Sequence, residues 1–201
     1  MDSDSTYVQK ALTGNKDAFD ELVKIYLPDV YRYLLWIVHD SNTAQDIAQE
    51  AFVRAWQNLK KFDSARPFKP WLLRIARNCA YDHLRRKEII PFSHLSEAEE
   101  YYVRQTVDTA PQPATHAHNL EQAEHVQAML DRLPVKYREV LMLHYLEELT
   151  TPEIANMLSL NHETVRTRLR RARALFRETL TVQDGTFIPL PKLTPQSHTA
   201  E

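Results

Sequence analysis

The scarcity of glycine is the feature that most limits what this chain can fold into. Only two glycines, Gly14 and Gly185, occur among its 201 residues. Phosphate-binding loops, dinucleotide fingerprints and nucleophile elbows need glycines clustered at fixed spacing, so none of these sites is possible here. Since glycine is common in tight turns, its scarcity also indicates that tight turns and β-strands are few. The sequence therefore predicts an all-α protein.

The length and the cysteine content limit the class of protein further. A chain of 201 residues with 43% hydrophobic content can bury one medium core or two small ones, and the length favours two. Cys79 is the single cysteine, so we expect no internal disulfide and no cysteine-based zinc site. There is no apolar run of 18 residues, and the first residues are polar and acidic. We therefore expect a cytoplasmic protein without a signal peptide or membrane insertion.

Catalysis and metal binding find little support in the sequence. Cys79 lies on an apolar stripe, and the pair His116 and His118 lies in a polar, proline-containing segment. Neither arrangement provides the clustered ligands or the paired nucleophile and base that such chemistry needs. We therefore expect no catalytic residue, no metal site and no cofactor.

Charge is distributed unevenly, although the formal net charge is only −2. Residues 69–88 and residues 161–178 each carry six basic and two acidic side chains. Residues 88–124 carry seven acidic side chains and one arginine. Two basic helices separated by an acidic spacer suggest two nucleic-acid contacts joined by a tether that avoids DNA.

Hydrophobic periodicity divides the chain into two small helical domains. Residues 1–88 form the first, with a proline at position 28 that is expected to kink or restart its long helix. Residues 89–119 lose the periodicity and form a flexible acidic linker. Residues 120–180 form a four-helix domain, and residues 181–201 a mobile tail.

The cleanest helix of the first domain spans residues 43–59, where apolar residues recur at spacings of three and four. The next helix, from about 70 to 87, carries a polar and basic stripe on its outward face, at the positions Arg74, Asn78, Tyr81 and Arg85. Basic groups interleaved with an aromatic ring and an amide can follow a phosphate backbone and stack on bases.

Residues 150–176 have the pattern of a helix-turn-helix. Thr151 is the expected cap of the first helix, with Pro152 in its first turn. Asn161 begins the second helix, where its side chain can accept a hydrogen bond from the N–H of Thr164. The predicted buried stripe of this helix is Val165, Leu169, Ala172 and Phe176. Rotation by about 100° per residue from this stripe gives the face that would enter a DNA groove, namely Glu163, Arg166, Thr167, Arg170 and Arg171. A solvated arginine-rich helix is the alternative, but it would not need the short capped helix that precedes it.

With these segments in order, the chain resembles the extracytoplasmic-function (ECF) group of bacterial RNA polymerase sigma factors, in the sigma-70 family. The likeness rests on five segments, which follow the order of the family and make up about half of the chain. They are AFDELVKIYLPDVYRYLL at 18–35, TAQDIAQEAFVRAWQNL at 43–59, FKPWLLRIARNCAYDHLRRK at 68–87, LPVKYREVLMLHYLEELTTPEIANML at 133–158 and ETVRTRLRRARALFRE at 163–178.

The resemblance assigns a role to each part. It implies that the helix at 43–59 docks on the clamp helices of core RNA polymerase and that the second domain meets the polymerase flap. The candidate docking residues are Asp46, Gln49, Glu50 and Arg54. On the sequence alone, a merely solvated helix face is the favoured explanation of these polar residues, and the resemblance reverses this preference.

The resemblance further implies that the segment at 61–68 and the helix that follows bind the −10 promoter element and the melted strand. The candidates for this contact are Lys61, Phe68, Arg74, Arg77, Asn78, Tyr81 and Arg85. The aromatic residues at 68 and 71 can either stack on a flipped base or pack in the core. Core packing is favoured for Trp71, and for Phe68 the two interpretations remain open.

The last helix is similar to the helix with which the family binds the −35 element. This resemblance implies contacts with duplex DNA through Glu163, Thr164, Arg166, Thr167, Arg170 and Arg171. Ser159 departs from the family, which usually has glycine at the bend of the helix-turn-helix. A non-glycine residue at positive φ costs about 1 kcal/mol, so the turn is expected to be slightly reshaped. His162 and Glu163 also stand where small residues are common, which leaves the base preference open.

The predicted function is therefore a non-enzymatic transcription initiation factor that binds core RNA polymerase and both duplex and melted promoter DNA. The resemblance also implies an anti-sigma factor as a partner. One alternative is a stand-alone helix-turn-helix regulator that binds duplex operators. Another is an interaction protein that only sequesters polymerase, but such a protein would need neither basic helix.

Overall fold

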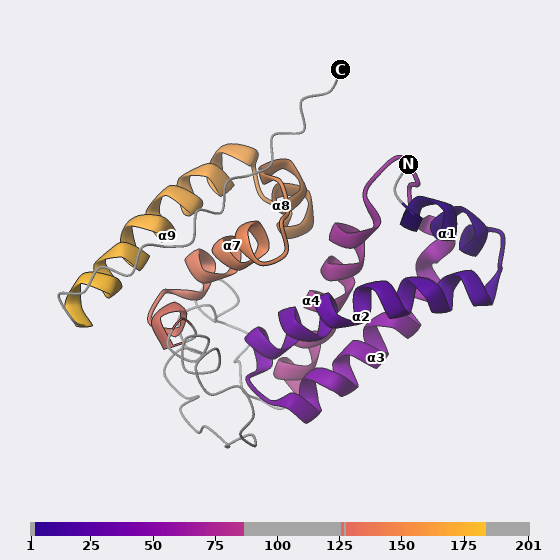
Figure 1. Ribbon diagram of the computed structural model, residues 1–201, viewed down its shortest axis with the longest axis horizontal. Coiled ribbons are helices and arrows are strands. Elements are labelled where there is room, and N and C mark those ends of the chain that lie inside the picture. Colours follow the sequence, from indigo (N-terminus) through magenta and orange to yellow (C-terminus); the bar gives the residue numbers. More distant parts are fainter. Residues whose placement is uncertain (1–2, 87–125, 127, 184–201) are drawn as a thin grey trace.

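The computed structural model describes residues 3–86, 126 and 128–183, and within these ranges it contains helices and no strand (Figure 1). The prediction of an all-α fold with two helical domains is therefore confirmed. The expected linker at 89–119 lies outside the described residues, as does the tail from 184 onward. In chain order the elements are α1 (Ser3–Leu12), α2 (Lys16–Val38), α3 (Ser41–Asn58), the 3₁₀ turn η1 (Leu59–Lys61), α4 (Phe68–Arg86), α7 (Val135–Tyr145), α8 (Thr151–Leu158) and α9 (His162–Gln183).

Helices α1 to α4 form the N-terminal group, in which α2, α3 and α4 pack against one another. Each of these helices buries an apolar stripe, and the centre of the core contains Leu22, Leu34, Ile47 and Leu72, all at most 1% exposed. The small residues of α3 let its neighbours approach closely, since Ala44, Ala51 and Ala55 are fully buried. The periodicity of residues 43–59 thus predicted both the helix and its buried face.

Helix α2 runs without interruption through Pro28, so of the two expected effects of this proline, a kink or a restart, the restart is wrong. Pro28 and Lys24 both lie on the exposed side of the helix. Water can therefore satisfy the carbonyl group of Lys24, which the proline ring leaves without its usual N–H partner. Two side-chain caps fix helix starts in this domain: Asn15 accepts a hydrogen bond from the N–H of Ala18 at 3.0 Å, and Asp40 from that of Thr43 at 2.7 Å.

Helices α7, α8 and α9 form the C-terminal group, and residues 128–131 just before it are also helical. The predicted stripe of α9 is confirmed, because Val165, Leu169, Ala172 and Phe176 are all buried. Helix α9 continues to Gln183, three residues past the expected start of the tail.

The predicted caps of the helix-turn-helix need two corrections, one to the capping residue of α8 and one to the hydrogen-bond partner of Asn161 at the start of α9. The cap of α8 is Thr150 rather than Thr151, because the backbone N–H of Thr150 donates to the Glu153 carboxylate at 2.7 Å in a capping box. At the start of α9 the Asn161 side chain accepts from the N–H of Glu163 at 2.9 Å, not from that of Thr164. The sequence indicated a polar cap at each place, but the exact register depends on the backbone.

Ser159 ends α8 in the left-handed conformation, with φ 55° and ψ 41°. Its N–H bonds back into the last turn of α8, and Leu160 N–H donates to Ala155 O at 2.9 Å. The turn therefore keeps the conformation that usually selects glycine. The expectation of a reshaped turn is wrong, because Ser159 itself adopts the strained left-handed backbone conformation.

The two groups of helices are in contact. Figure 1 shows α7 and α8 beside α2 and α4, with α9 on the far side of the C-terminal group, and α4 packs against α8. Helix α9 thus turns its outer face away from the N-terminal group. The basic face of α4, in contrast, lies next to the contact between the domains.

Candidate nucleic-acid interface

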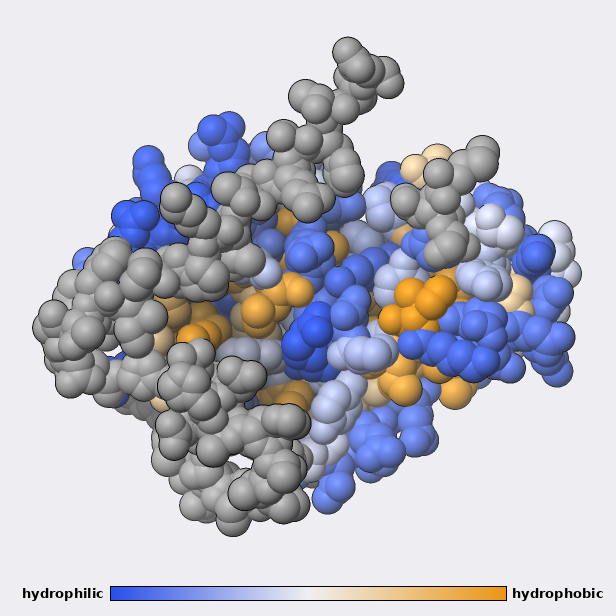
Figure 2. All heavy atoms as spheres, in the orientation of Figure 1, coloured by the Kyte–Doolittle hydropathy of each residue, from blue (hydrophilic) through white to orange (hydrophobic). Residues whose placement is uncertain are grey.

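The outer face of α9 lies beside an open groove of about 400 Å³ between α9 and the start of α7. Helix α9 presents this face because the buried side chains described between 162 and 178 all lie on the opposite side. Hydrophilic residues gather along this helix in Figure 2. The groove is lined by Lys136, Tyr137, Asn161, Glu163, Thr164, Thr167, Arg168 and Arg171.

The structure brings the predicted residues of α9 together on this surface. Thr167 is half-buried and the others are exposed, namely Glu163, Thr164, Arg166, Arg170 and Arg171. Arg166 lies 3.7 Å from Glu163, and both side chains are more than 60% exposed, so the pair is weak and its members can turn toward a ligand. An exposed helix of this width, rich in arginine, fits the major groove of DNA.

Sequence reasoning missed Lys136 and Tyr137 in this groove. They occupy the first turn of α7, where the Lys136 ammonium group lies 5.5 Å from the centre of the Tyr137 ring. Their only sequence signal is a basic residue next to an aromatic residue just after Pro134. The chain distance from α9 hid their proximity to it.

A second polar face runs along α4. Arg74, Asn78 and Arg85 are exposed, as predicted, while Tyr81 is half-buried, with the guanidinium carbon of Arg77 4.5 Å from the centre of its ring. Arg85 bonds its neighbour Asp82 at 2.8 Å. Lys61, at the end of η1, is also exposed.

Phe68 does not belong to this exposed face. It is 4% exposed, and its ring lies 5.4 to 5.5 Å from the rings of Tyr26, Phe62 and Trp71. The prediction that Phe68 contacts DNA is therefore corrected: burial in this aromatic cluster leaves no ring face for a base. Trp71 packs in the same cluster as expected and stays half-buried.

Arg77 is also held away from solvent. Its guanidinium group binds both carboxylate oxygens of Glu139 in α7, at 2.6 and 3.3 Å. Burial lowers the pKa of Arg77, but the Glu139 carboxylate more than offsets this effect, and the net pKa is raised. Arg77 is therefore a charged interdomain contact here, and the predicted DNA contact is not available to it in this conformation.

The predicted docking face lies on α3. Asp46 and Gln49 are exposed, whereas Glu50 and Arg54 form an ion pair at 2.6 Å. Arg54 also binds Asp82 of α4 at 3.1 Å. Val53, which sequence reasoning missed, is 56% exposed between these residues. An apolar side chain in the centre of a polar rim is typical of a protein interface.

Cys79 is fully buried, and burial raises the pKa of its thiol to about 11. A thiol of this kind is protonated at neutral pH and is a poor nucleophile. Among the described residues, no three His, Cys, Asp or Glu side chains gather at a possible metal site. Within the same ranges, no helix is long and apolar enough to cross a membrane.

Comparisons with known proteins agree with this geometry. Family models described as "Sigma-70 region 2" and "Sigma-70, region 4" match residues 22–89 and 123–176. The ECF RNA polymerase sigma factor SigW of Bacillus subtilis is 35% identical over 86% of this chain and 94% of its own length. The probable RNA polymerase sigma factor RfaY of Xanthomonas campestris is 36% identical over 88% of this chain, which spans only 44% of that relative.

The fold has also been seen before. The solved structure of CnrH in complex with the cytosolic domain of CnrY matches 91% of this chain and 100% of its own, with a TM-score of 0.68 and 28% identity. The sequence match to SigW extends across both helical groups and the segment between them. The chain therefore belongs to the sigma-70 family, as an RNA polymerase sigma factor of the ECF group.

Proposed function

We propose that this sigma factor directs core RNA polymerase to promoters with two elements and reads each element with a separate domain. In this proposal residues 1–88 bind the −10 element, residues 89–119 are the joining segment, residues 120–180 bind the −35 element, and residues 181–201 have no assigned role. The observation that carries the proposal is the presence of two exposed basic faces, on α4 and α9, in different helical domains. A regulator that reads a single duplex site would need only the second face.

On the −35 side, α9 enters the major groove. Arg166, Arg170 and Arg171 divide between phosphate oxygens and guanine edges, and Glu163 accepts from cytosine amino groups. Thr164 and Thr167 supply shorter hydrogen-bonding side chains on the same exposed surface. Lys136 extends the positive surface across the groove.

On the −10 side, α4 binds the strand that melting releases. Arg74, Arg85 and Lys61 neutralise phosphates, Asn78 hydrogen-bonds bases, and Tyr81 offers a partial stacking surface. Because a bound single strand cannot re-pair, this contact stabilises the open promoter. The factor contributes binding and no bond chemistry, so we propose that it is not an enzyme.

Helix α3 carries the proposed contact with the polymerase clamp helices, through Asp46, Gln49, Glu50 and Arg54, and the C-terminal domain contacts the flap. The chain then acts in the cytoplasm, where core polymerase is found. CnrH was solved with the cytosolic domain of CnrY, and RpoE of Bartonella quintana was solved with the anti-sigma factor NepR. We propose an anti-sigma partner for this chain.

In vitro transcription with purified core polymerase on a library of promoters tests the proposal. We expect the protein to co-purify with core and to direct initiation at a shared pair of elements. Tight binding to duplex operators by the free protein, without any initiation, would replace this proposal with a stand-alone regulator.

A narrower test changes the strand-binding face alone. Asn78→Ala with Arg85→Ala removes one amide and one cation from α4. We expect open-complex formation to fall about tenfold or more, since each lost base contact is worth about 1–3 kcal/mol. Permanganate reactivity of unpaired thymines measures this formation. Gln9→Ala with Lys10→Ala makes the same chemical change on exposed positions of α1 and serves as the control. Normal opening by the α4 variant would remove the strand-binding assignment.

A further inference from the structure

A cluster of four aromatic rings lies where α2, the end of η1 and the start of α4 meet. Its members are Tyr26, Phe62, Phe68 and Trp71, and the first three of these are at most 8% exposed. Phe62 directly precedes the exposed residues 63–67, and Phe68 directly follows them. We call residues 63–67 the 63–67 loop. The cluster therefore holds both ends of this loop.

The ring contacts fix the distance between the two ends of the loop. The ring centres of Phe62 and Phe68 are 5.5 Å apart, and the two rings are nearly perpendicular, at 87°. The ring centre of Trp71, in the first turn of α4, lies 4.9 Å from that of Phe62 and 5.4 Å from that of Phe68. Separations of this size are typical of favourable aromatic pairs. A loop whose ends are held in this way loses less conformational freedom when it binds a strand.

Asp63 orders the loop from within. Its Oδ1 atom accepts a hydrogen bond from the N–H of Ala65 at 3.0 Å, and its backbone carbonyl group accepts one from the N–H of Arg66 at 2.9 Å. The Arg66 guanidinium group also lies 3.3 Å from the Asp63 carboxylate, but both side chains are at least 60% exposed, so this ion pair contributes little. The shape of the loop therefore depends on the bonds to its backbone and on the ring cluster at its base.

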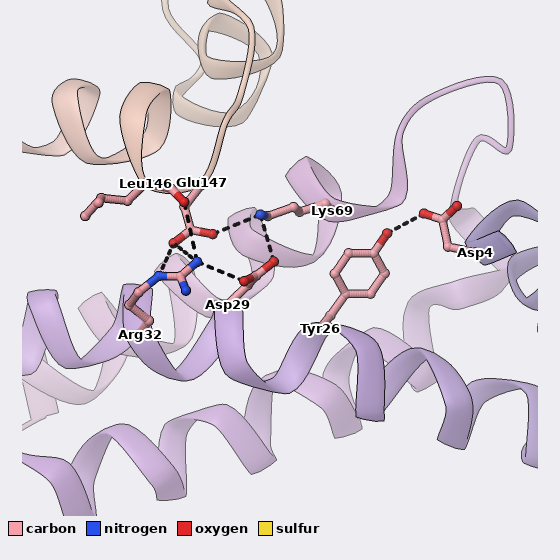
Figure 3. A network of polar contacts seen from close by, with 7 residues as sticks. All are labelled: Asp4, Tyr26, Asp29, Arg32, Lys69, Leu146 and Glu147. Atoms are coloured by element: carbon pink, nitrogen blue, oxygen red, sulfur yellow. Dashed lines mark hydrogen bonds and ion pairs between the residues drawn. The ribbon is translucent and has the colours of Figure 1, made fainter. Parts of the chain in front are cut away.

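Tyr26 connects this cluster with α1 (Figure 3). Its ring centre lies 5.5 Å from that of Phe68, and its hydroxyl group donates a hydrogen bond to the carboxylate of Asp4, 22 positions earlier in the chain. Three residues further along α2, the Asp29 carboxylate lies 2.7 Å from the ammonium group of Lys69. Helix α2 thus holds two successive residues of α4, Phe68 and Lys69, and Asp4 fixes the ring that contacts the first of them.

We propose that Asp4 and Tyr26 are positioning residues for strand capture: their hydrogen bond holds the base of the 63–67 loop in place, so that the loop is already ordered when melting releases a strand. This inference rests on the proposed function, in which the N-terminal domain binds the −10 element. Helix α1 also packs against η1, the element just before the loop. Tyr26 is 8% exposed, too deeply buried to stack on a base, so it acts through the loop.

The first measurement follows the loop itself. Full-length protein carrying Ser64→Cys, at an exposed position of the loop, receives a nitroxide spin label, while the buried Cys79 stays unlabelled. Asp4→Ala and Tyr26→Phe remove the same hydrogen bond from its two sides, and we expect each change to narrow the electron paramagnetic resonance lines of the label. Asp4→Asn keeps an acceptor for the hydroxyl group and should leave the lines broad.

Asp17→Ala is the matched control, because Asp4 and Asp17 are each an acidic residue in the first turn of a helix and Asp17 is exposed. It should not change the mobility of the label. If one bond is responsible, Asp4→Ala combined with Tyr26→Phe should narrow the lines no more than either change alone. Unchanged lines in either single variant, or equal narrowing by Asp17→Ala or Asp4→Asn, would overturn the inference.

The second measurement uses holoenzyme assembled from core polymerase and the unlabelled variants, at a promoter found in the library. We expect Asp4→Ala and Tyr26→Phe each to lower the equilibrium constant for promoter opening about fivefold, the effect of losing one hydrogen bond of ordinary strength. The affinities for core polymerase and for the closed promoter should stay unchanged, and Asp4→Asn should open the promoter normally. An equal loss of core affinity and of opening would overturn the positioning role, because it would indicate general damage to the domain.

The two measurements separate this inference from the proposed function. If the loop becomes mobile while promoter opening stays normal, the Asp4–Tyr26 bond orders the loop without contributing to strand capture, and the positioning role is overturned. If the unchanged protein opens no promoter, the proposed function is wrong and the positioning role is lost with it. The spin label then still shows whether this bond orders the loop.

Discussion

At the scale of single residues, Ser159 carries strain that glycine would not. Its φ of 55° lies in the left-handed region, which costs about 1–2 kcal/mol for a residue with a Cβ atom, while glycine loses about 0.4–1 kcal/mol through its freer unfolded chain. Ser159→Gly should therefore raise the free energy of unfolding by about 0.5–1 kcal/mol, measured by urea denaturation. Ser159→Ala keeps the Cβ atom and should bring no such gain; equal stabilisation by both changes would contradict the strain argument.

The surroundings of His39 predict how the free energy of unfolding changes with pH. It ends α2 and faces the C-terminal domain, with Nε2 4.0 Å from Asp131 and with Arg138 bonded to the same carboxylate. Burial lowers the pKa of His39, Asp131 raises it and Arg138 lowers it further, with a net decrease. As the pH falls, His39 is therefore protonated at a higher pH in the unfolded chain than in the folded protein.

The sign follows from this order of protonation. Stability from the neutral His39 is present above the ordinary histidine pKa of about 6.5 and is lost as the pH falls from there through the lower folded pKa. We expect the urea midpoint to decrease between pH 7.5 and 5.5, and to decrease less in His39→Asn, because asparagine tolerates the left-handed conformation but does not titrate. A parallel decline in both proteins would assign the effect to other groups.

At the scale of elements, the cap of α8 can be tested by itself. The Glu153 carboxylate accepts from both the N–H and the hydroxyl group of Thr150, and it lies near the positive end of the helix. Glu153→Ala should lower the free energy of unfolding by about 1 kcal/mol. Asn156→Ala, an exposed change within the same helix, is the matched control and should be neutral or slightly stabilising in urea denaturation.

The elements also show what the sequence could predict. The stripes of α3 and α9 follow from local spacing, because one buried face on a helix repeats every three to four residues. The cap of α8 was displaced by one residue, since Thr150 and Thr151 are chemically equivalent and only the backbone selects one of them. Phe68 was ambiguous because an apolar residue at the start of a helix suits both a core and a stacking site.

The contact between the two domains could not be predicted from the sequence. Arg77 and Glu139 are separated by 62 positions, and neither belongs to a motif that announces a partner. The periodic pattern of α4 gave Arg77 the same basic character as Arg74, and only the docked domains distinguish them. Local patterns thus determined the elements, while the charge pairing depends on how the elements meet.

At the scale of the whole molecule, two buried carboxylates should couple the unfolding of the two domains, because Glu139 pairs with Arg77 and Glu147 pairs with Arg32 and Lys69 across the contact between them. Glu139 and Glu147 become exposed to solvent only when the two groups of helices separate. Both domains therefore lose these contacts together. We expect the unchanged protein to unfold in a single calorimetric transition, with equal calorimetric and van't Hoff enthalpies. The variant Glu139→Gln with Glu147→Gln should show two transitions, because its domains are no longer held by charge.

The charge-matched control distinguishes coupling from a general change in charge. Asp20→Asn with Glu21→Gln alters the same net charge far from these ion pairs and should keep a single transition. Splitting in this variant as well would attribute the effect to charge alone. Two transitions in the unchanged protein would mean that the buried carboxylates contribute too little to join the domains.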